Sequence, residues 1–168
     1  MRGFLLGVIV TLVVLFGGAY LMISGGHVDP RAVPSGPTPF ERRTAMHSLD
    51  AWVDAHASKQ ENPFQPSMDN IMDGSMVYDK HCALCHGSLK ESVSPMKTKF
   101  YPPVPQLMNN TPDDPDANLF YVTKYGVKLS GMPGWDGVLT DDDIWKAVLF
   151  IKNSAKMKDG APATPPAQ

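Results

Sequence analysis

The hydrophobic and polar positions divide the chain into one long apolar segment followed by several shorter amphipathic ones. Residues 3–23, GFLLGVIVTLVVLFGGAYLMI, contain no charged residue. Because about 20 apolar residues in a helix span the hydrocarbon core of a bilayer, the pattern predicts a transmembrane anchor over 1–24. Arg2 precedes this segment and no Lys or Arg follows it before Arg31, which places the N-terminus in the cytoplasm. A cleaved signal peptide is the alternative, although its apolar core is usually shorter.

Residues 25–66 form a predicted linker that contains an extra amphipathic helix. Residues 24–40 are rich in Gly, Pro and Ser, which is typical of a linker. Helical periodicity follows over about 41–60, and the Asn62-Pro63 pair after it indicates a stop. The apolar stripe of this helix packs either on its own domain or on a partner subunit. The residues on that stripe are Met46, Leu49, Trp52 or Val53, and His56.

A further amphipathic segment starts at Ser67 and runs into the sequence YDKHC. Its periodicity predicts a helix, in which Gly74 indicates either close packing against a neighbour or a weak point. The positions expected on its buried side are Ile71, Met72, Met76 and Val77.

Two more helices are predicted towards the C-terminus. The segment over about 114–125 is closed by Gly126, a residue typical of the position just after a helix. Thr140 and Asp143 form a start that resembles a capping box, with Asp in place of Glu. The apolar positions that line up in the helix after them are Ile144, Val148 and Ile151, with Trp145 and Leu149 beside them.

The remaining stretches have no periodicity. Residues 88–112 contain prolines throughout and are expected to form a long ordered loop, whereas the tail over 159–168 is expected to be disordered. The head over 67–158 is therefore predicted to be all-α with long Pro-rich loops. Three short helices bury only a marginal core by themselves, so a large apolar group is expected in the middle of this domain.

Composition and charge exclude some classes of function. The formal net charge is −2, whereas a nucleic-acid binder usually carries a basic patch and a high pI. With two cysteines in the chain, no disulfide framework is available to stabilise the fold.

Both cysteines lie in one short motif, Cys82-Ala83-Leu84-Cys85-His86. This is the C-x-x-C-H pattern by which a c-type haem is attached. Each thiol adds to one vinyl group of a porphyrin and forms a thioether. The histidine that follows is then held beneath the iron, where its Nε2 atom is a ligand.

Other uses of a cysteine pair need residues that this chain does not supply. Zinc takes about four ligands at short spacing, and His81 with the remote His27, His47 and His56 does not make such a set. A thioredoxin-like pair would lie in a βαβ pattern, which is absent from the sequence.

Haem iron also takes a sixth ligand, and methionine at that position suits electron transfer whereas an open position suits gas binding. Met96, Met108 and Met132 follow the motif. Met132 lies in KYGVKLSGMPGWDG, where Gly131 and Pro133-Gly134 are expected to let the backbone approach the porphyrin and Trp135 to pack on it. Met132 is therefore the predicted ligand, and Met96 and Met108 are expected to be packing or loop residues.

In combination, these motifs resemble a class I c-type cytochrome domain over residues 67–157. GSMVYDKHCALCHG resembles its haem-binding helix, GMPGW its axial-methionine loop and LTDDDIWKAVLFIK its C-terminal helix. The resemblance implies the small class I cytochrome c fold and one covalently bound haem c. Cys82 and Cys85 would bind the haem, with His86 as the proximal and Met132 as the distal iron ligand.

The resemblance extends to the loop after the motif. Family members have a Pro-x-Leu sequence whose proline carbonyl accepts a hydrogen bond from the proximal histidine, and PQL at Pro105 to Leu107 matches it. The loop is longer than in the smallest members, so Pro102 and Pro103 are alternatives. Tyr101 is a candidate partner of a haem propionate, or it simply packs against the prolines.

These expectations favour electron transfer without bond chemistry. The first hypothesis is a single-pass protein of a bacterial inner membrane whose periplasmic haem domain carries electrons between respiratory partners. The second is a fixed subunit of a larger membrane oxidase, reductase or dehydrogenase. A haem sensor or peroxidase-like enzyme is a third, which Met132 disfavours. The expected contacts are redox partner proteins and membrane lipid, with no nucleic acid and no small-molecule substrate.

Overall fold

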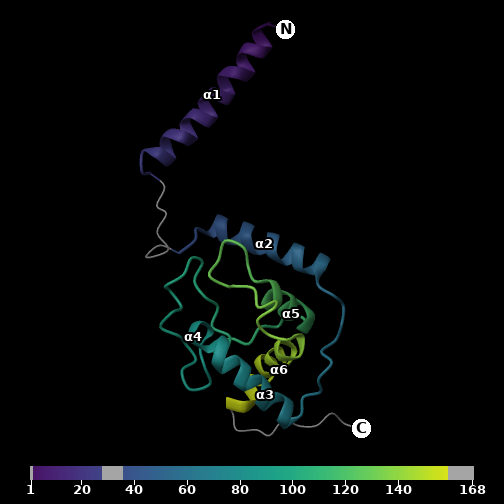
Figure 1. The fold of residues 1–168 in the computed structure, drawn as a ribbon. Coiled ribbons are helices and arrows are strands. Elements are labelled where there is room, and N and C mark those ends of the chain that lie inside the picture. Colours follow the sequence, from purple (N-terminus) through teal and green to yellow (C-terminus); the bar gives the residue numbers. More distant parts are fainter. Residues whose placement is uncertain (1, 28–35, 159–168) are drawn as a thin grey trace. The chain divides into compact units, whose positions relative to one another are not determined.

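A computed structural model describes residues 2–27 and 36–158 of the chain. The predicted disorder of 159–168 and part of the predicted linker, 28–35, lie outside these residues. The chain divides into two compact units, Met1–Arg31 and Ala32–Gln168. In the described ranges every regular element is a helix, and the order is α1 to α6 (Figure 1). The predicted all-α class is confirmed.

The first unit consists of α1, which spans Arg2–Ser24. A helix of 23 residues is about 34 Å long, enough to cross a hydrocarbon core. Among the described residues, α1 is the one helix that is long and apolar enough for a membrane span. The predicted apolar helix is therefore confirmed, and it is compatible with a single-pass anchor.

Helix α2 spans Pro39–His56, so it starts and ends earlier than the predicted 41–60. Its start is a capping box that the periodicity did not reveal. The Glu41 amide donates to Thr38 Oγ1 at 3.3 Å, the Thr38 amide donates to Glu41 Oε2 at 2.7 Å, and Pro39 occupies the first turn. At the other end, Ala57 is already extended.

The apolar stripe of α2 packs on α5 of the same unit (Figure 1). Val53 is buried and Leu49 is half-buried, whereas Trp52 is 57% exposed. Trp52 Nε1 nevertheless donates to the Tyr121 hydroxyl at 3.1 Å, and Asn118 Nδ2 donates to Asp54 Oδ1 at 2.9 Å. Polar contacts therefore hold α2 on its own domain as much as apolar ones.

The core of the second unit lies between α3, Met68–His81, and α6, Asp141–Lys158. The residues that α3 buries are Ile71, Gly74, Ser75 and Tyr78. The two helices approach closely at Gly74, where a Cβ atom would collide with the backbone carbonyl of Lys146. Lys146 also pairs with Asp73 at 2.7 Å. Of the two explanations for Gly74, close packing is the correct one.

The predicted burial of Met72 and Met76 was wrong. Their side chains are 47% and 62% exposed, and Val77 is half-buried. The contact at Gly74 fixes which face of α3 meets α6. At 100° per residue that face runs through Ile71, Ser75 and Tyr78, so the methionines lie outside it.

The remaining helices match their predicted positions. Helix α5 spans Asp116–Tyr125, is closed by Gly126 at φ 72°, and stacks Phe120 on Trp145 with ring centroids 4.2 Å apart. In α6 the expected residues Ile144, Trp145, Val148, Leu149 and Ile151 are all buried.

Between α3 and α5 lie the short helix α4, Ala83–His86, and a long segment without regular structure. This segment supplies Met108, which is buried in one cluster with side chains of α3 and α6. The loop therefore forms part of the core. The burial of Met108 keeps the loop residues next to it close to α4.

Candidate functional site

The C-x-x-C-H motif occupies the junction of α3 and α4. Cys82 is the C-cap of α3 and the N-cap of α4, so Cys82, Cys85 and His86 lie within little more than one helical turn. Both cysteines are free thiols, and Cys82 packs against the core cluster. This turn therefore presents two sulfur atoms and one imidazole together.

The electrostatics of Cys82 do not suit a thiolate. Burial, followed by the nearby Cys85, raises the pKa of the Cys82 thiol to about 12. Zinc binding and thiol–disulfide exchange both use the deprotonated sulfur. In the part of the chain that the structure describes, no cluster of three or more His, Cys, Asp or Glu side chains could hold a metal ion. The described residues therefore offer no ligand set typical of a zinc site.

The imidazole of His86 is oriented by the proline loop. His86 Nδ1 lies 2.8 Å from the carbonyl oxygen of Pro105. A carbonyl only accepts hydrogen bonds, so Nδ1 carries the proton and Nε2 is left with a free lone pair. Burial lowers the pKa of His86, and the bond to Pro105 opposes this shift. The ring is thus a neutral imidazole, the form that ligates iron.

Pro102 and Pro103 do not make this contact, although sequence reasoning left all three prolines open. Leu107 of the same loop is half-buried against the core, and its amide donates to the His86 carbonyl at 3.1 Å. Pro105 and Leu107 are therefore both brought to the motif.

Tyr101 is placed differently. Its hydroxyl interacts with the Glu41 carboxylate at the start of α2. Burial, and then the charge of Glu41, raise the pKa of Tyr101. Its predicted contact with a haem propionate stays a prediction.

Of the three methionines considered as ligands, Met108 is buried in the core, whereas Met96 and Met132 are half-buried. Met132 lies in a loop that is closed on itself: the Val127 amide donates to the Met132 carbonyl at 3.1 Å, and the Met132 amide donates to Ser130 Oγ at 3.1 Å. This closure fixes the backbone from which the Met132 thioether projects.

The glycines around Met132 have neighbours other than those expected. A Cβ atom at Gly131 would collide with the Phe100 ring, and one at Gly134 would lie 2.9 Å from the Tyr125 carbonyl oxygen. Close approach to a porphyrin was the predicted reason for both glycines, but contacts within the protein already require them.

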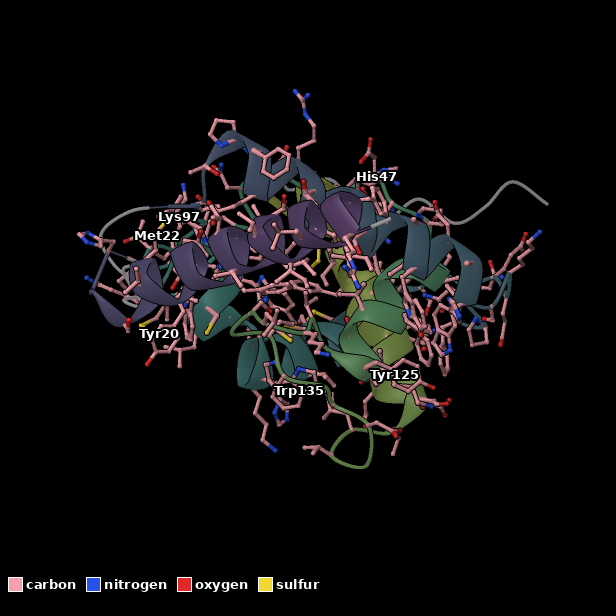
Figure 2. The ribbon with its side chains drawn as sticks, turned by 90° about the horizontal axis from the view of Figure 1, so that it is seen from above. Tyr20, Met22, His47, Lys97, Tyr125 and Trp135 are labelled. Atoms are coloured by element: carbon pink, nitrogen blue, oxygen red, sulfur yellow. The ribbon has the colours of Figure 1, made fainter. Side chains whose placement is uncertain are left out.

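Trp135 brings the methionine loop to the motif helix. Its ring meets the His81 ring edge-on, with centroids 5.1 Å apart and an interplanar angle of 72°. Its amide donates to the Lys124 carbonyl at 2.9 Å, so Trp135 lies next to the end of α5, near Tyr125 (Figure 2). The loop is therefore held between α3 and α5.

Sequence reasoning missed Tyr78, which is completely buried and whose hydroxyl donates to the Gly87 carbonyl at 2.9 Å. Burial raises the pKa of this hydroxyl, so it stays protonated and remains a donor. The spacing of Ile71, Ser75 and Tyr78 along one helix face was the available signal.

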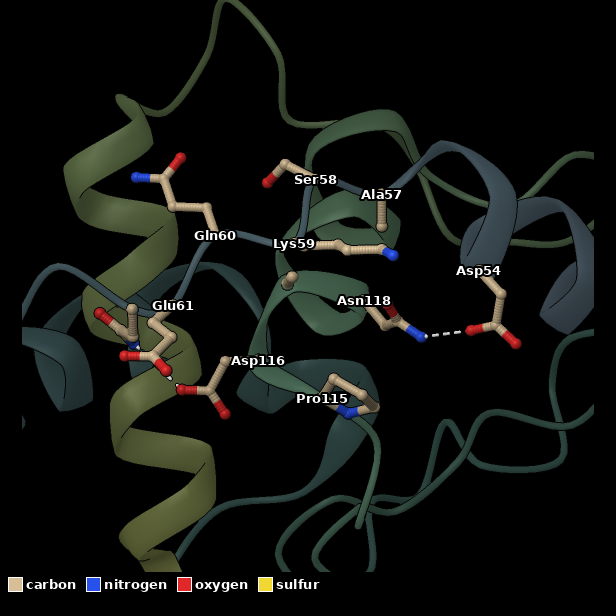
Figure 3. Close-up of a pocket in the computed structure, with 11 residues that line it drawn as sticks. Asp54, Ala57, Ser58, Lys59, Gln60, Glu61, Pro115, Asp116 and Asn118 are labelled. Atoms are coloured by element: carbon tan, nitrogen blue, oxygen red, sulfur yellow. Dashed lines mark hydrogen bonds between the residues drawn. The ribbon is translucent and has the colours of Figure 1, made fainter.

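A hollow of about 440 Å³ lies elsewhere in the same unit (Figure 3). It is lined by the end of α2, the connector after it and the start of α5, and the Asn118–Asp54 hydrogen bond lies at its edge. None of the predicted site residues lines it. The hollow lies at the end of α2 and the start of α5 and is distinct from the predicted site.

A family model described as cytochrome C oxidase, cbb3-type, subunit III matches residues 69–151. The chain carries a c-type cytochrome domain. The matched range runs from the first turn of α3 into α6, so it contains the motif turn, the proline loop and the methionine loop. Helices α1 and α2 lie outside it. A comparison with curated proteins gave no match.

A cytochrome domain binds haem iron and takes part in electron transport. The residues of this domain fit that group: two free cysteines lie on one turn beside an imidazole whose Nδ1 is bonded to Pro105 and whose Nε2 is available to iron. Soft sulfur and imidazole donors are those that haem iron and its attachment use.

Proposed function

We propose that the chain is a membrane-tethered periplasmic monohaem cytochrome c that passes single electrons between respiratory partners. The observation that carries the proposal is the hydrogen bond from His86 Nδ1 to Pro105 on the same turn as the two free cysteines. Once bound, haem supplies an iron that alternates between its ferric and ferrous states. The apolar helix α1 supports tethering to the inner membrane.

In this proposal the residues of the domain attach, ligate and enclose the haem. Cys82 and Cys85 would attach it, and His86 and Met132 would ligate its iron. Pro105 would orient the His86 ring, Leu107 and Trp135 would pack against the haem, and Tyr101 would hydrogen-bond a propionate. With both ligands supplied by the protein, the iron would transfer electrons without binding a substrate or a gas.

The second candidate is a fixed cytochrome c subunit of a larger membrane complex. The description of the matching family, a subunit of an oxidase, favours it. Solubilisation in mild detergent separates the two: a carrier purifies alone, whereas a subunit brings other chains with it in fixed ratio.

The visible spectrum of the purified full chain tests the ligand set, for wild type and for Met132→Ala. The wild type is expected to show low-spin c-type haem, no carbon monoxide binding when reduced, and the weak far-red band of sulfur ligation when oxidised. Met132→Ala is expected to lose that band and to bind carbon monoxide.

Met96→Ala is the matched control, because Met96 is also a half-buried loop methionine that follows the motif. Its spectrum should equal that of the wild type. If the reduced wild type binds carbon monoxide and the oxidised wild type lacks the far-red band, Met132 is not the ligand. Gas sensing or catalysis would then be the favoured function.

A further inference from the structure

Four consecutive carbonyl groups end the motif turn, and each accepts a hydrogen bond from outside α4. Because the last carbonyls of any helix lack partners within it, they need such donors. The donors are Ser94 Oγ to Leu84, Gln106 Nε2 to Cys85 at 3.0 Å, the Leu107 amide to His86 at 3.1 Å, and the Tyr78 hydroxyl to Gly87 at 2.9 Å. Three of these four donors belong to the loop that also contains Pro105.

Gln106 makes more of these contacts than any local pattern predicts. Besides the bond to Cys85, its Nε2 donates to the Val104 carbonyl at 2.9 Å, and its Oε1 accepts from the Ser94 amide. Only 8% of the residue is exposed. Both amide protons and the amide oxygen are therefore used, and each of the three bonds ties a different segment of backbone.

These bonds hold the residues on either side of Pro105. Gln106 follows it in the chain, and the carbonyl that Gln106 holds on the other side belongs to Val104. Because Gln106 is bonded to the motif turn and Val104 is bonded to Gln106, the Pro105 carbonyl has little freedom to turn away from His86 Nδ1.

We propose that Gln106 is a positioning residue that keeps the Pro105 carbonyl on His86 and thereby sets the reduction potential of the iron. The inference rests on the proposed haem site. A hydrogen bond from Nδ1 to a carbonyl raises the basicity of the imidazole, and a more basic ligand favours ferric iron. Weakening that bond therefore raises the reduction potential.

The chemistry of the site explains why a primary amide is needed. A glutamate of the same length would offer only acceptors to two carbonyl groups, and asparagine is one methylene too short. Methionine has about the same length and would fill the space without making any of the three bonds.

The test compares the midpoint potential of the full chain for wild type, Gln106→Met and a matched control, Asn62→Leu. Asn62 is also a half-buried structural amide: its Nδ2 donates to the Trp145 carbonyl at 3.0 Å and its Oδ1 accepts from the Phe64 amide at 3.0 Å. Its partners lie away from the motif turn. Both variants should lose stability, but only Gln106→Met should shift the potential, and the shift should be upward.

A second readout follows the bond itself. Exchange of the His86 Nδ1 proton with water, measured by NMR on the ferrous protein, should be faster in Gln106→Met than in wild type and unchanged in Asn62→Leu. An unchanged potential with unchanged proton exchange in Gln106→Met would overturn the proposal, as would equal shifts in both variants.

The failure of the haem site itself would look different, because the wild type would then lack a low-spin c-type spectrum. Where Gln106→Met does not incorporate haem, Gln106→Asn provides the same comparison, since it keeps the polar group but not its reach. An Asn variant with wild-type potential and wild-type proton exchange would equally overturn the role of Gln106.

Discussion

The lack of a side chain at Gly74 determines how closely α3 and α6 approach each other. At Gly74 the space that a methyl group would occupy is filled by the backbone of Lys146, and Phe150 Cβ lies 3.1 Å away. One turn further along, Tyr78 is packed on Phe150 with ring centroids 5.2 Å apart. A small residue followed by a large one on the same face lets α3 approach α6 and then locks it there.

Gly74→Ala should therefore destabilise the domain. The added methyl meets backbone rather than the flexible end of a side chain, so the helices have to move apart. Overpacking of this kind costs about 1–3 kcal/mol, which exceeds the gain of about 1 kcal/mol from the better helix propensity of alanine. Denaturant unfolding of the full chain measures the loss.

Gly36→Ala is the control for the change of residue type. The nearest atom to its added methyl would lie 4.0 Å away, on Pro103. Its free energy of unfolding should equal or slightly exceed that of the wild type. Equal stability of both variants would mean that α3 and α6 tolerate separation at Gly74.

At the residue scale, the sequence predicted those site residues that belong to a local motif. The C-x-x-C-H motif predicted Cys82, Cys85 and His86, and the PQL sequence predicted Pro105. Gln106 and Ser94 were not found, because the bonds that tie them to each other and to the motif turn join residues ten or more positions apart, and no local pattern marks a buried amide. Met72 and Met76 were assigned to the core because methionine is apolar, although the contact at Gly74 turns them outwards.

At the scale of elements, the helix starts are set by side chains that bond back to the backbone. The Asp143 amide donates to Thr140 Oγ1 at 3.1 Å, and the Thr140 amide donates to Asp143 Oδ2 at 3.2 Å. The same arrangement of Thr38 and Glu41 starts α2. Both boxes hold a carboxylate near the positive end of a helix dipole.

The Asp143 box predicts an acid-sensitive contribution to stability. The hydrogen bond from Thr140 lowers the pKa of Asp143 below its ordinary value of 3.8. A carboxyl group whose pKa is lower in the folded state stabilises the fold above the unfolded pKa, and this contribution is lost as the pH falls through the folded pKa. The stability difference between wild type and Asp143→Asn should be constant from neutral pH down to above the ordinary pKa of 3.8, and should shrink as the pH falls below that value.

Unfolding followed by circular dichroism over a series of acid pH values measures this difference. In a Thr140→Ala background, which costs about 1 kcal/mol for the lost cap, most of the pH dependence from Asp143 should be absent. A difference that persists undiminished in strong acid would contradict the role of the carboxylate charge.

Element boundaries were predictable where the stop or start signal adjoins the periodic segment. Gly126 and Thr140 do so, and α5 and α6 follow the prediction. Helix α2 starts earlier because Thr38 and Pro39 precede the apolar periodicity. Helix α4 has only four residues, too short for any period, and it exists because donors from other segments satisfy its carbonyl groups.

At the scale of the whole molecule, the chain joins two units of different chemistry. Helix α1 buries none of its residues within the structure and carries no charge after Arg2, whereas the second unit has its own core. The proposed function requires that α1 be buried in a bilayer and kept.

The full chain should therefore remain with membranes after an alkaline carbonate wash and be released by detergent. Leu12→Arg puts a charge near the centre of α1, where it costs about 2.5–3.5 kcal/mol, and should reduce the membrane-bound fraction. Ser24→Arg, at the end of the helix, should not. A mature chain that begins after Ala19 in intact-mass measurement would show instead that α1 is a cleaved signal peptide.

The pairing of α3 with α6 also orders the events of biosynthesis. Asp73 and Lys146 are 73 positions apart, so α6 leaves the ribosome well after α3. Until it arrives, Tyr78 and Cys82 lack the apolar partners that cover them in the finished domain. Cys82 itself stays half-buried in the finished domain, so a group would be joined to its sulfur more easily before the core closes than afterwards. The rate of such a modification, relative to the rate of folding, would then influence how much of the chain matures.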